Sequence, residues 1–397
     1  MRQENLFSSL VLMFLICLFA GACSRRPEPE DEIQALRRKH TEYRNSLRLF
    51  HQEFPARATL PEGGFYLFGM GPRIKMVYQH GVLKEAFSGK AIRKWDVVSD
   101  EIIPSEYTVL LETSDGRTVV ISENETGIRI KEGDSRVTVS KGRVSLPDFQ
   151  GKRYAPVLRV LHQEMLVNIF NGCPLPNYFV YKKAWYRDGA MVCMCLEKTG
   201  NLHLVKDWIL GLSEPYDRNN AGNEEPDNLG QALYMISLVS DTTHPLAAKI
   251  LAEIPEIRVG NFIDGITDGS LHPVYATKWL KFGLKNLGLA DPYEIPRIED
   301  SYSSLFWMDY RRDGLEDTSG SRPDLLYPYL GWARAHFIGD KGGGIVGNLE
   351  YPLTWETQAS QADYQGMSPV SESYVAAKTA APHTWHSAEI FLYLLDF

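Results

Sequence analysis

The sequence has little cysteine and no excess of positive charge. Its 397 residues include 42 lysines and arginines against 50 aspartates and glutamates, which gives a formal net charge of −8. Nucleic-acid surfaces need clustered positive charge, so this balance and the lack of a long basic run argue against a nucleic-acid partner. With 44% hydrophobic and 11% aromatic residues, the chain is long and apolar enough to bury a sizeable core.

The five cysteines make neither a metal-binding spacing nor a disulfide framework. Cys17 and Cys23 lie in the N-terminal leader, which leaves Cys173, Cys193 and Cys195, and three thiols cannot all pair. Cys193 and Cys195 are two residues apart in an expected helix and point to different sides. A bridge from Cys173 to one of them stays open in an oxidising compartment, but we expect buried free thiols. We expect no metal and no cofactor.

The N-terminus has the features of an export signal. Arg2 precedes an apolar run from Leu6 to Phe19, and Ala20-Gly21-Ala22-Cys23 places small residues before a cysteine, which resembles a bacterial lipobox. The run is shorter than the roughly 20 residues of a membrane-spanning helix, so a transmembrane anchor fits less well. We expect a signal peptide over 1–22, lipidation of Cys23, and a membrane-anchored, extracytoplasmic lipoprotein that faces the periplasm or the cell surface.

The following segments change character twice. Residues 23–59 predict a polar tether, rich in proline and charge, that leads into a helix. Residues 60–150 alternate around Asp115-Gly116 and Gly133-Asp134, and such turns between alternating runs predict antiparallel hairpins in a small β module. From 151 to 397 apolar residues recur at three- and four-residue steps, which predicts helices that alternate with long polar loops. Ten or eleven helices can be counted there, among them 300–311, 327–337 and 355–364, and one of the long polar loops spans 258–272.

The most informative stretch is Trp185-Tyr-Arg187-Asp188, which runs into an apolar helix that ends at Gly200-Asn201. An aromatic ring, a guanidinium and a carboxylate together at the start of a helix suit a sugar, because the ring stacks on its C–H face and the charged groups bond its hydroxyls. The alternative is purely structural. Asp188 would then be an acidic residue in the first turn of a helix, and Arg187 would pair with a neighbour.

This motif, Trp-x-Arg-Asp-x-Ala, resembles the signature of the six-hairpin, (α/α)6-toroid glycosidases, the glucoamylase-like superfamily. The resemblance covers roughly residues 150–397. It implies a mainly helical α+β fold, in which an (α/α)6 toroid over 151–397 follows the β module, and the toroid's long loops open on one face. It also implies an inverting glycoside hydrolase acting on an oligo- or polysaccharide.

Such a hydrolase needs two carboxyl groups, an acid for the leaving oxygen and a base for the attacking water. On the loops of the expected open face we assign Asp268 as the acid and Glu356 as the base. Glu225 is the reserve acid, since it is crowded by Glu224 and Asp227 and crowding raises a carboxyl pKa. Each of these residues also has a purely structural explanation, because acidic residues favour the first turns of helices.

Further residues complete the expected sugar site. We assign its contacts to eight side chains: Trp185, Arg187, Asp188, Glu225, Asp227, His272, His383 and Trp385. A zinc site at His383, His386 and Glu389, which are spaced by three, is a minor alternative. Two other functions stay open: a non-catalytic glycan-binding lipoprotein on the same scaffold, and a polysaccharide lyase that uses Tyr181, Tyr186 or His272.

Overall fold

We describe the fold from a computed structural model. The structure describes residues 31–53, 59–218, 222–267, 269–296, 298, 347–359 and 362–395. The chain divides into two compact units, residues 1–38 and 39–397. In the first unit, the described residues 31–38 begin helix α2 (Glu32–Glu53), where the Asp31 side chain accepts a hydrogen bond from the Ile33 N–H. The second unit contains all the other elements described below.

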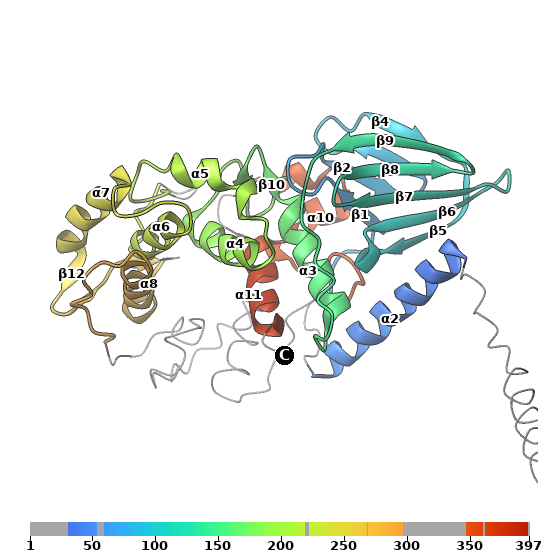
Figure 1. Cartoon of the computed structure of the whole chain (residues 1–397). Coiled ribbons are helices and arrows are strands. Elements are labelled where there is room, and N and C mark those ends of the chain that lie inside the picture. The colour runs from blue at the N-terminus through green and yellow to red at the C-terminus, as the bar shows by residue number, and fades with distance from the viewer. Residues whose placement is uncertain are drawn as a thin grey trace, which may run out of the picture. The chain divides into compact units, whose positions relative to one another are not determined.

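Two antiparallel sheets form an N-terminal β module (Figure 1), and in each sheet strands adjacent in sequence lie side by side. The first sheet contains β1 (Phe65–Phe68), β2 (Met76–Gln79), β3 (Val82–Glu85) and β4 (Ala91–Lys94). The second contains β5 (Val97–Ile103), β6 (Thr108–Thr113), β7 (Thr118–Asn124), β8 (Gly127–Glu132) and β9 (Ser135–Lys141). The hairpins predicted around Asp115-Gly116 and Gly133-Asp134 are confirmed, and both glycines have the positive φ that such turns require.

Helix α3 (Ala155–Val167) connects the β module to the helices that follow. The Gln163 amide donates to the Leu67 carbonyl of β1 at 2.7 Å. Arg159 donates to the Ser105 carbonyl and stacks 4.7 Å from the centre of the Tyr107 ring. These buried and partly buried contacts fix the helix against the β module, because a backbone carbonyl without a hydrogen-bond partner there would cost free energy.

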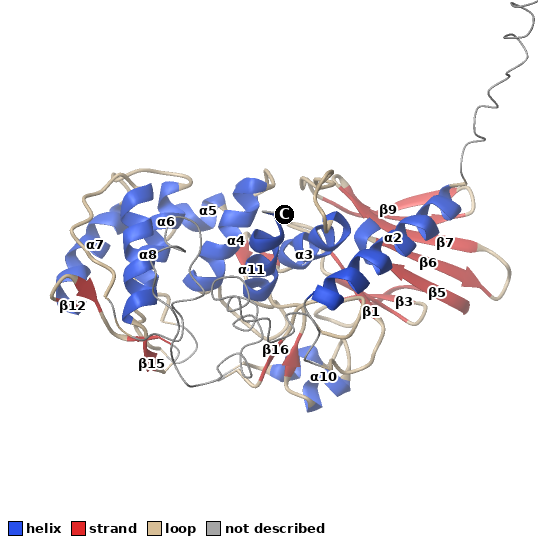
Figure 2. Cartoon of the chain, turned by 90° about the horizontal axis from the view of Figure 1, so that it is seen from below, coloured by secondary structure: helices blue, strands red, loops and turns tan. Residues whose placement is uncertain are grey.

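The rest of the described chain is helical, with short hairpins. The remaining helices are α4 (Tyr186–Lys198), α5 (Lys206–Leu210), α6 (Asp227–Ser237), α7 (Pro245–Glu253), α8 (Pro273–Asn286), α10 (Glu372–Ala376) and α11 (Thr384–Leu395). The two-residue strands pair as β10 (Ile169–Phe170) with β11 (Cys173–Pro174), β12 (Arg258–Val259) with β13 (Phe262–Ile263), β14 (Ile266–Thr267) with β15 (Ser270–Leu271), and β16 (Glu356–Thr357) with β17 (Thr379–Ala380). Helix α6 packs on α8, and α11 lies between α3 and α4, as Figures 1 and 2 both show.

A buried carboxylate, Glu164 of α3, joins this helix to two distant segments. It accepts hydrogen bonds from the Leu353 N–H at 2.5 Å, the Thr354 hydroxyl at 2.6 Å and the Ser387 hydroxyl at 3.1 Å. Burial raises the pKa of Glu164 to about 7, although these donors favour its charged form. The Thr354 hydroxyl also accepts from the His383 N–H at 3.0 Å. One carboxylate thus fixes both the chain before β16 and the start of α11.

The expected (α/α)6 toroid is wrong. The described residues contain nine α-helices and six antiparallel sheets, which is a mixed α+β fold. Helices α5 and α10 have five residues each, too short to form the long walls of a helical ring. The expected helices over 300–311 and 327–337 lie outside the described residues.

Two local predictions fail, for different physical reasons. We expected a helix over 355–364, but Glu356 and Thr357 pair with Ala380 and Thr379 as strands. We expected one long polar loop over 258–272, but it contains the β12–β13 and β14–β15 hairpins. At Glu356 the pairing with a segment distant in sequence selects a conformation that local periodicity does not favour. The hairpins over 258–272 are local, and the missed signal is turn chemistry, since Gly260 and Gly269 both have a positive φ.

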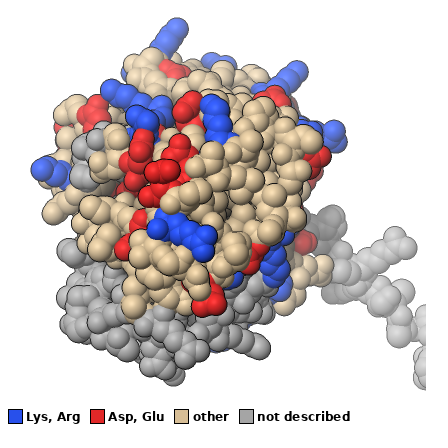
Figure 3. Space-filling view, turned by 90° about the vertical axis from the view of Figure 1, so that its left-hand side faces the viewer, with Lys and Arg blue, Asp and Glu red and all other residues tan. Residues whose placement is uncertain are grey.

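The surface near α7 and β12 carries charges of both signs. Figure 3 shows acidic side chains gathered beside basic ones on this face, and nearby ion pairs join Arg218 to Glu224 at 2.6 Å and Lys249 to Glu214 at 3.8 Å. Among the described residues, no helix has both the length and the apolar character needed to cross a bilayer.

We predict that Glu164→Leu lowers the free energy of unfolding by about 3 kcal/mol or more, because three donors lose their buried acceptor. Glu164→Gln keeps one acceptor oxygen and should fall between Leu and wild type. Urea denaturation followed by tryptophan fluorescence measures all three. A Leu variant as stable as wild type would mean that these hydrogen bonds do not hold the segments together.

Candidate functional site

Helix α4 begins where the sequence motif predicts. Trp185 is its N-cap residue, and Arg187 and Asp188 lie in its first turn. The Asp217 carboxylate accepts a hydrogen bond from the Tyr186 N–H at 2.5 Å and so satisfies one of the free N–H groups of the first turn. Gly189 faces Trp208 so closely that an added Cβ would lie 2.6 Å from the ring. The start of the helix is therefore fixed in position by its neighbours.

Asp188 lies beside two residues from the far end of the chain. The Nε2 atom of His383, the residue before α11, lies 3.2 Å from a Glu356 carboxylate oxygen and 4.0 Å from Asp188 Oδ1. The two carboxylate oxygens are therefore at most 7.2 Å apart, the sum of these distances. The side chains of Asp188 and His383 are 3% and 5% exposed, but that of Glu356 is 21% exposed. The cluster thus reaches solvent at Glu356.

Aromatic side chains lie around Asp188, His383 and Glu356, which we call the trio. The Tyr181 hydroxyl donates a short hydrogen bond to Glu356. The Tyr181 ring meets the Trp185 ring edge to face at 5.1 Å, and the ring of His383 lies 4.7 Å from that of His386. Burial raises the pKa of Tyr181 well above its usual value, so the phenol keeps its proton and acts as a donor.

The electrostatics of the trio favour a shared proton. Burial raises the pKa of Asp188 to about 6, against the attraction of His383 and Arg187, and the negative charges of Glu356 and Asp217 raise it further. Burial alone would lower the pKa of His383, but Glu356 and Asp188 raise it above its usual value. Near neutral pH the trio therefore contains a carboxyl group close to its titration point, as a general acid requires.

Three buried polar atoms at this place have no hydrogen-bond partner among the described residues. They are Asp188 Oδ1, His383 Nδ1 and Trp185 Nε1. A buried polar atom without a hydrogen-bond partner lowers the stability of the fold by roughly 1–3 kcal/mol. Such atoms therefore indicate a functional role. Asp188 Oδ1 can accept a hydrogen bond, Trp185 Nε1 can donate one, and His383 Nδ1 can do either. This set of donors and acceptors matches the hydroxyl groups of a polar ligand.

Arg187, next to Asp188 in sequence, has a different environment. Its guanidinium lies 2.7 Å from Glu225 and 3.5 Å from Asp227, and 5.2 Å from the centre of the Trp385 ring. Asp227 also accepts hydrogen bonds from the Gln231 amide and the Thr267 hydroxyl. Arg187 thus has the neighbouring ion pairs that the structural alternative expected. That these four residues also contact a ligand stays a prediction.

The remaining candidates are placed as follows. His272 is the N-cap residue of α8 and is buried. In the same helix, burial and then Asp227 raise the pKa of Tyr275 well above its usual value, against the effect of Arg187. Asp268 and Cys23 lie outside the described residues. The thiols of Cys173, Cys193 and Cys195 are free, and those of Cys193 and Cys195 are buried, as expected.

The zinc alternative gains no support from the geometry. His386 Nδ1 bonds the Trp355 carbonyl at 2.5 Å, and burial raises the pKa of Glu389 well above its usual value. Within the described ranges no group of three or more metal-ligating side chains is arranged around a common point.

Sequence reasoning missed the partnership of Asp188 with Glu356 and the role of Glu164. A glutamate inside the apolar run from Leu158 to Ile169 was the available signal for Glu164, because a buried carboxylate requires partners. No comparable signal exists for the pair, since Asp188 and Glu356 lie far apart in the sequence.

We predict that Asp188→Asn stabilises the fold at pH 7. Asp188 holds its proton more tightly in the folded state, so wild-type stability from this group is complete below pH 4 and is lost as the pH rises through about 6. The loss is on the order of 3 kcal/mol for a shift of about two pKa units, and the amide avoids it. Urea denaturation at pH 4 and pH 7 tests this, with exposed Asp134→Asn as the control. A variant less stable than wild type at pH 7 would contradict it.

Comparison with protein-family models, with curated proteins and with solved structures gave no match.

Proposed function

We propose that the protein is a glycoside hydrolase whose two carboxyl groups are Asp188 and Glu356. The observation that carries the proposal is the trio itself, in which a buried carboxyl with a pKa near 6 faces a second, partly exposed carboxylate at no more than 7.2 Å. Glycosidases place their carboxyl groups roughly 5–5.5 Å apart when they retain configuration and 6.5–9.5 Å apart when they invert it. A separation of at most 7.2 Å between the two carboxylate oxygens is compatible with either arrangement.

The roles follow from the two environments. Asp188, protonated below about pH 6, donates its proton to the glycosidic oxygen as the C–O bond breaks. Glu356, at the solvent-exposed side, accepts a proton from the water that attacks the anomeric carbon, as in the inverting mechanism that the motif suggests. His383 lies between the carboxyl groups and reduces their mutual repulsion. Tyr181 orients Glu356 through its hydrogen bond.

Sugar recognition would use the surrounding rings and unmet polar atoms. The Trp185 indole N–H has no partner among the described residues, and the ring is only partly buried, so it can donate to a sugar hydroxyl. The Tyr181 and Trp185 rings offer apolar surface for the C–H face of a pyranose. This proposal rests on the local geometry of the trio and not on a toroidal fold.

A polysaccharide lyase fits this site less well, because its uronic-acid substrate carries a carboxylate that must be neutralised. Two carboxyl groups, Asp188 and Glu356, already face this site. Arg187, which could neutralise a substrate carboxylate, is already paired with Glu225 and Asp227. Negative charge near a negative substrate raises the free energy of binding. A non-catalytic glycan-binding protein would use the same rings and hydroxyl partners, and turnover separates it from a hydrolase.

We predict that Asp188→Asn and Glu356→Gln each lower the rate of sugar release from a sensitive oligosaccharide by about 100-fold or more, as expected on loss of a general acid or base. The assay screens wild type against a broad oligosaccharide panel by chromatography. Exposed Asp134→Asn and Glu256→Gln are the matched controls. Wild-type activity should decline above about pH 6, as Asp188 loses its proton.

Two results would contradict this assignment. Release that both variants retain would place the chemistry elsewhere. Glycan binding without release, if Trp185→Ala removes it, would favour the non-catalytic binding protein.

We also propose that the chain is a lipoprotein, anchored through Cys23 and exposed outside the cytoplasm. Cys23→Ser should move the protein from the membrane fraction to the soluble fraction of a bacterial host, because the lipid supplies the attachment. The control is Cys17→Ser, which lies within the apolar run. Equal membrane association of both variants and wild type would contradict lipidation.

A further inference from the structure

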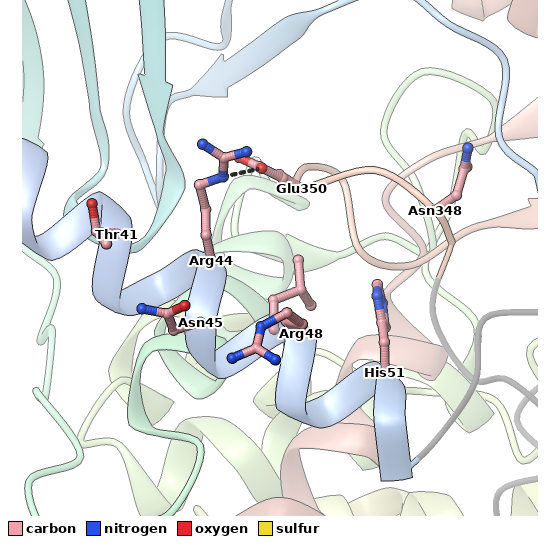
Figure 4. A pocket seen from close by; sticks show the side chains of 8 residues that line it. Thr41, Arg44, Asn45, Arg48, His51, Asn348 and Glu350 are labelled. Atoms are coloured by element: carbon pink, nitrogen blue, oxygen red, sulfur yellow. Dashed lines mark ion pairs between the residues drawn. The ribbon is translucent and has the colours of Figure 1, made fainter.

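A second candidate binding site lies away from the trio, where α2 meets residues 348–350. A cavity of about 490 Å³ opens there (Figure 4). The described residues that line it are Thr41, Arg44, Asn45, Leu47, Arg48, His51, Asn348 and Glu350. Six of them come from α2 and recur at spacings of three and four residues. One face of the helix therefore forms the wall of the cavity.

The cationic groups of this wall are only partly neutralised. Arg44 contacts Glu350 through Nε at 2.7 Å, and His40 contacts the other oxygen of the same carboxylate at 3.1 Å. The pKa of His40 is raised above its usual value: burial lowers it, but Glu350 and Glu101 outweigh burial. Arg48 has no ion pair among the described residues, and in Figure 4 its guanidinium stands apart from Glu350. The carboxylate of Glu350 is therefore already paired, whereas within the described ranges the Arg48 guanidinium is not.

Two further groups add donors. The Asn348 oxygen accepts from the Leu60 N–H at 2.8 Å, which leaves the amide nitrogen of Asn348 to donate. His51 Nε2 is buried and has no partner among the described residues, and burial lowers the pKa of this ring. His51 rises from the last turn of α2 towards the loop that carries Asn348 (Figure 4). A buried ring nitrogen without a partner indicates a missing hydrogen-bonding group.

We propose that this cavity binds a phosphate monoester or diester group. Guanidinium and amide donors from α2 and from the facing loop suit an oxyanion whose oxygens point in several directions. A cavity of this size has room for an organic group attached to the phosphate. The same chemistry is present in a soluble phosphate ester and in a phospholipid headgroup.

The test uses purified protein with two probes at low salt. Calorimetric titration with glycerol 3-phosphate detects a soluble ester, and sedimentation with phosphatidylcholine vesicles, with or without phosphatidylglycerol, detects a headgroup. We expect Arg48→Gln to weaken binding of the recognised probe about tenfold or more, as loss of a charge-assisted hydrogen bond does. Exposed Arg136→Gln, which removes the same charge from β9, should leave binding unchanged. Circular dichroism checks that both variants fold.

Each outcome decides the proposal. Saturable binding of glycerol 3-phosphate that only Arg48→Gln weakens supports a soluble ester. Binding to vesicles of either composition, with the same dependence on Arg48 and no dependence on Arg136, supports a lipid headgroup. Equal weakening by Arg48→Gln and Arg136→Gln would show attraction to overall charge and overturn the site, as would no saturable binding of either probe.

Discussion

The hydrogen bonds to the buried carboxylate of Glu164 are the constraint on which the candidate site depends. The segment that contains Leu353 leads into Glu356, the first residue of the two-residue strand β16, and His383 directly precedes α11. Glu164 collects the Leu353 N–H and two hydroxyl groups from these segments. A carboxylate is costly to bury, and only several good donors offset that cost, so the arrangement tolerates few alternatives.

Two adjacent residues of α4 illustrate how one helix turn can serve structure and chemistry at once. Arg187 is matched by Glu225 and Asp227, which ties α4 to the start of α6. Asp188 is buried with an unmet oxygen and a raised pKa, which the fold tolerates at a cost in stability near neutral pH. Unmet groups of this kind concentrate at functional sites, because a reacting group must keep capacity for its substrate.

The sequence contains enough information to predict local structure, but too little to predict which segments of the chain pack together. The hairpins at Asp115-Gly116 and Gly133-Asp134 follow from turn chemistry, which depends on neighbouring residues alone. The existence of α4 follows from its apolar run and its end near Gly200-Asn201, but its first N–H is satisfied by the distant Asp217. The toroid failed because a helical period says how one segment buries a face and not which partner covers it. Glu356 lies in a strand because of its pairing with Ala380, and its approach to Asp188 depends on α11. Such contacts leave no local mark.

The position of α11 between α3 and α4 has a consequence for the order of synthesis. The ribosome completes α3 and α4 long before it reaches residues 384–395, so their facing apolar surfaces wait for a partner from a late part of the chain. His383 arrives with that partner. A chain that emerges with its N-terminus first can therefore assemble the β module early, but the trio cannot form until residues 384–395 have emerged, and until then the exposed surfaces offer a binding site for chaperones.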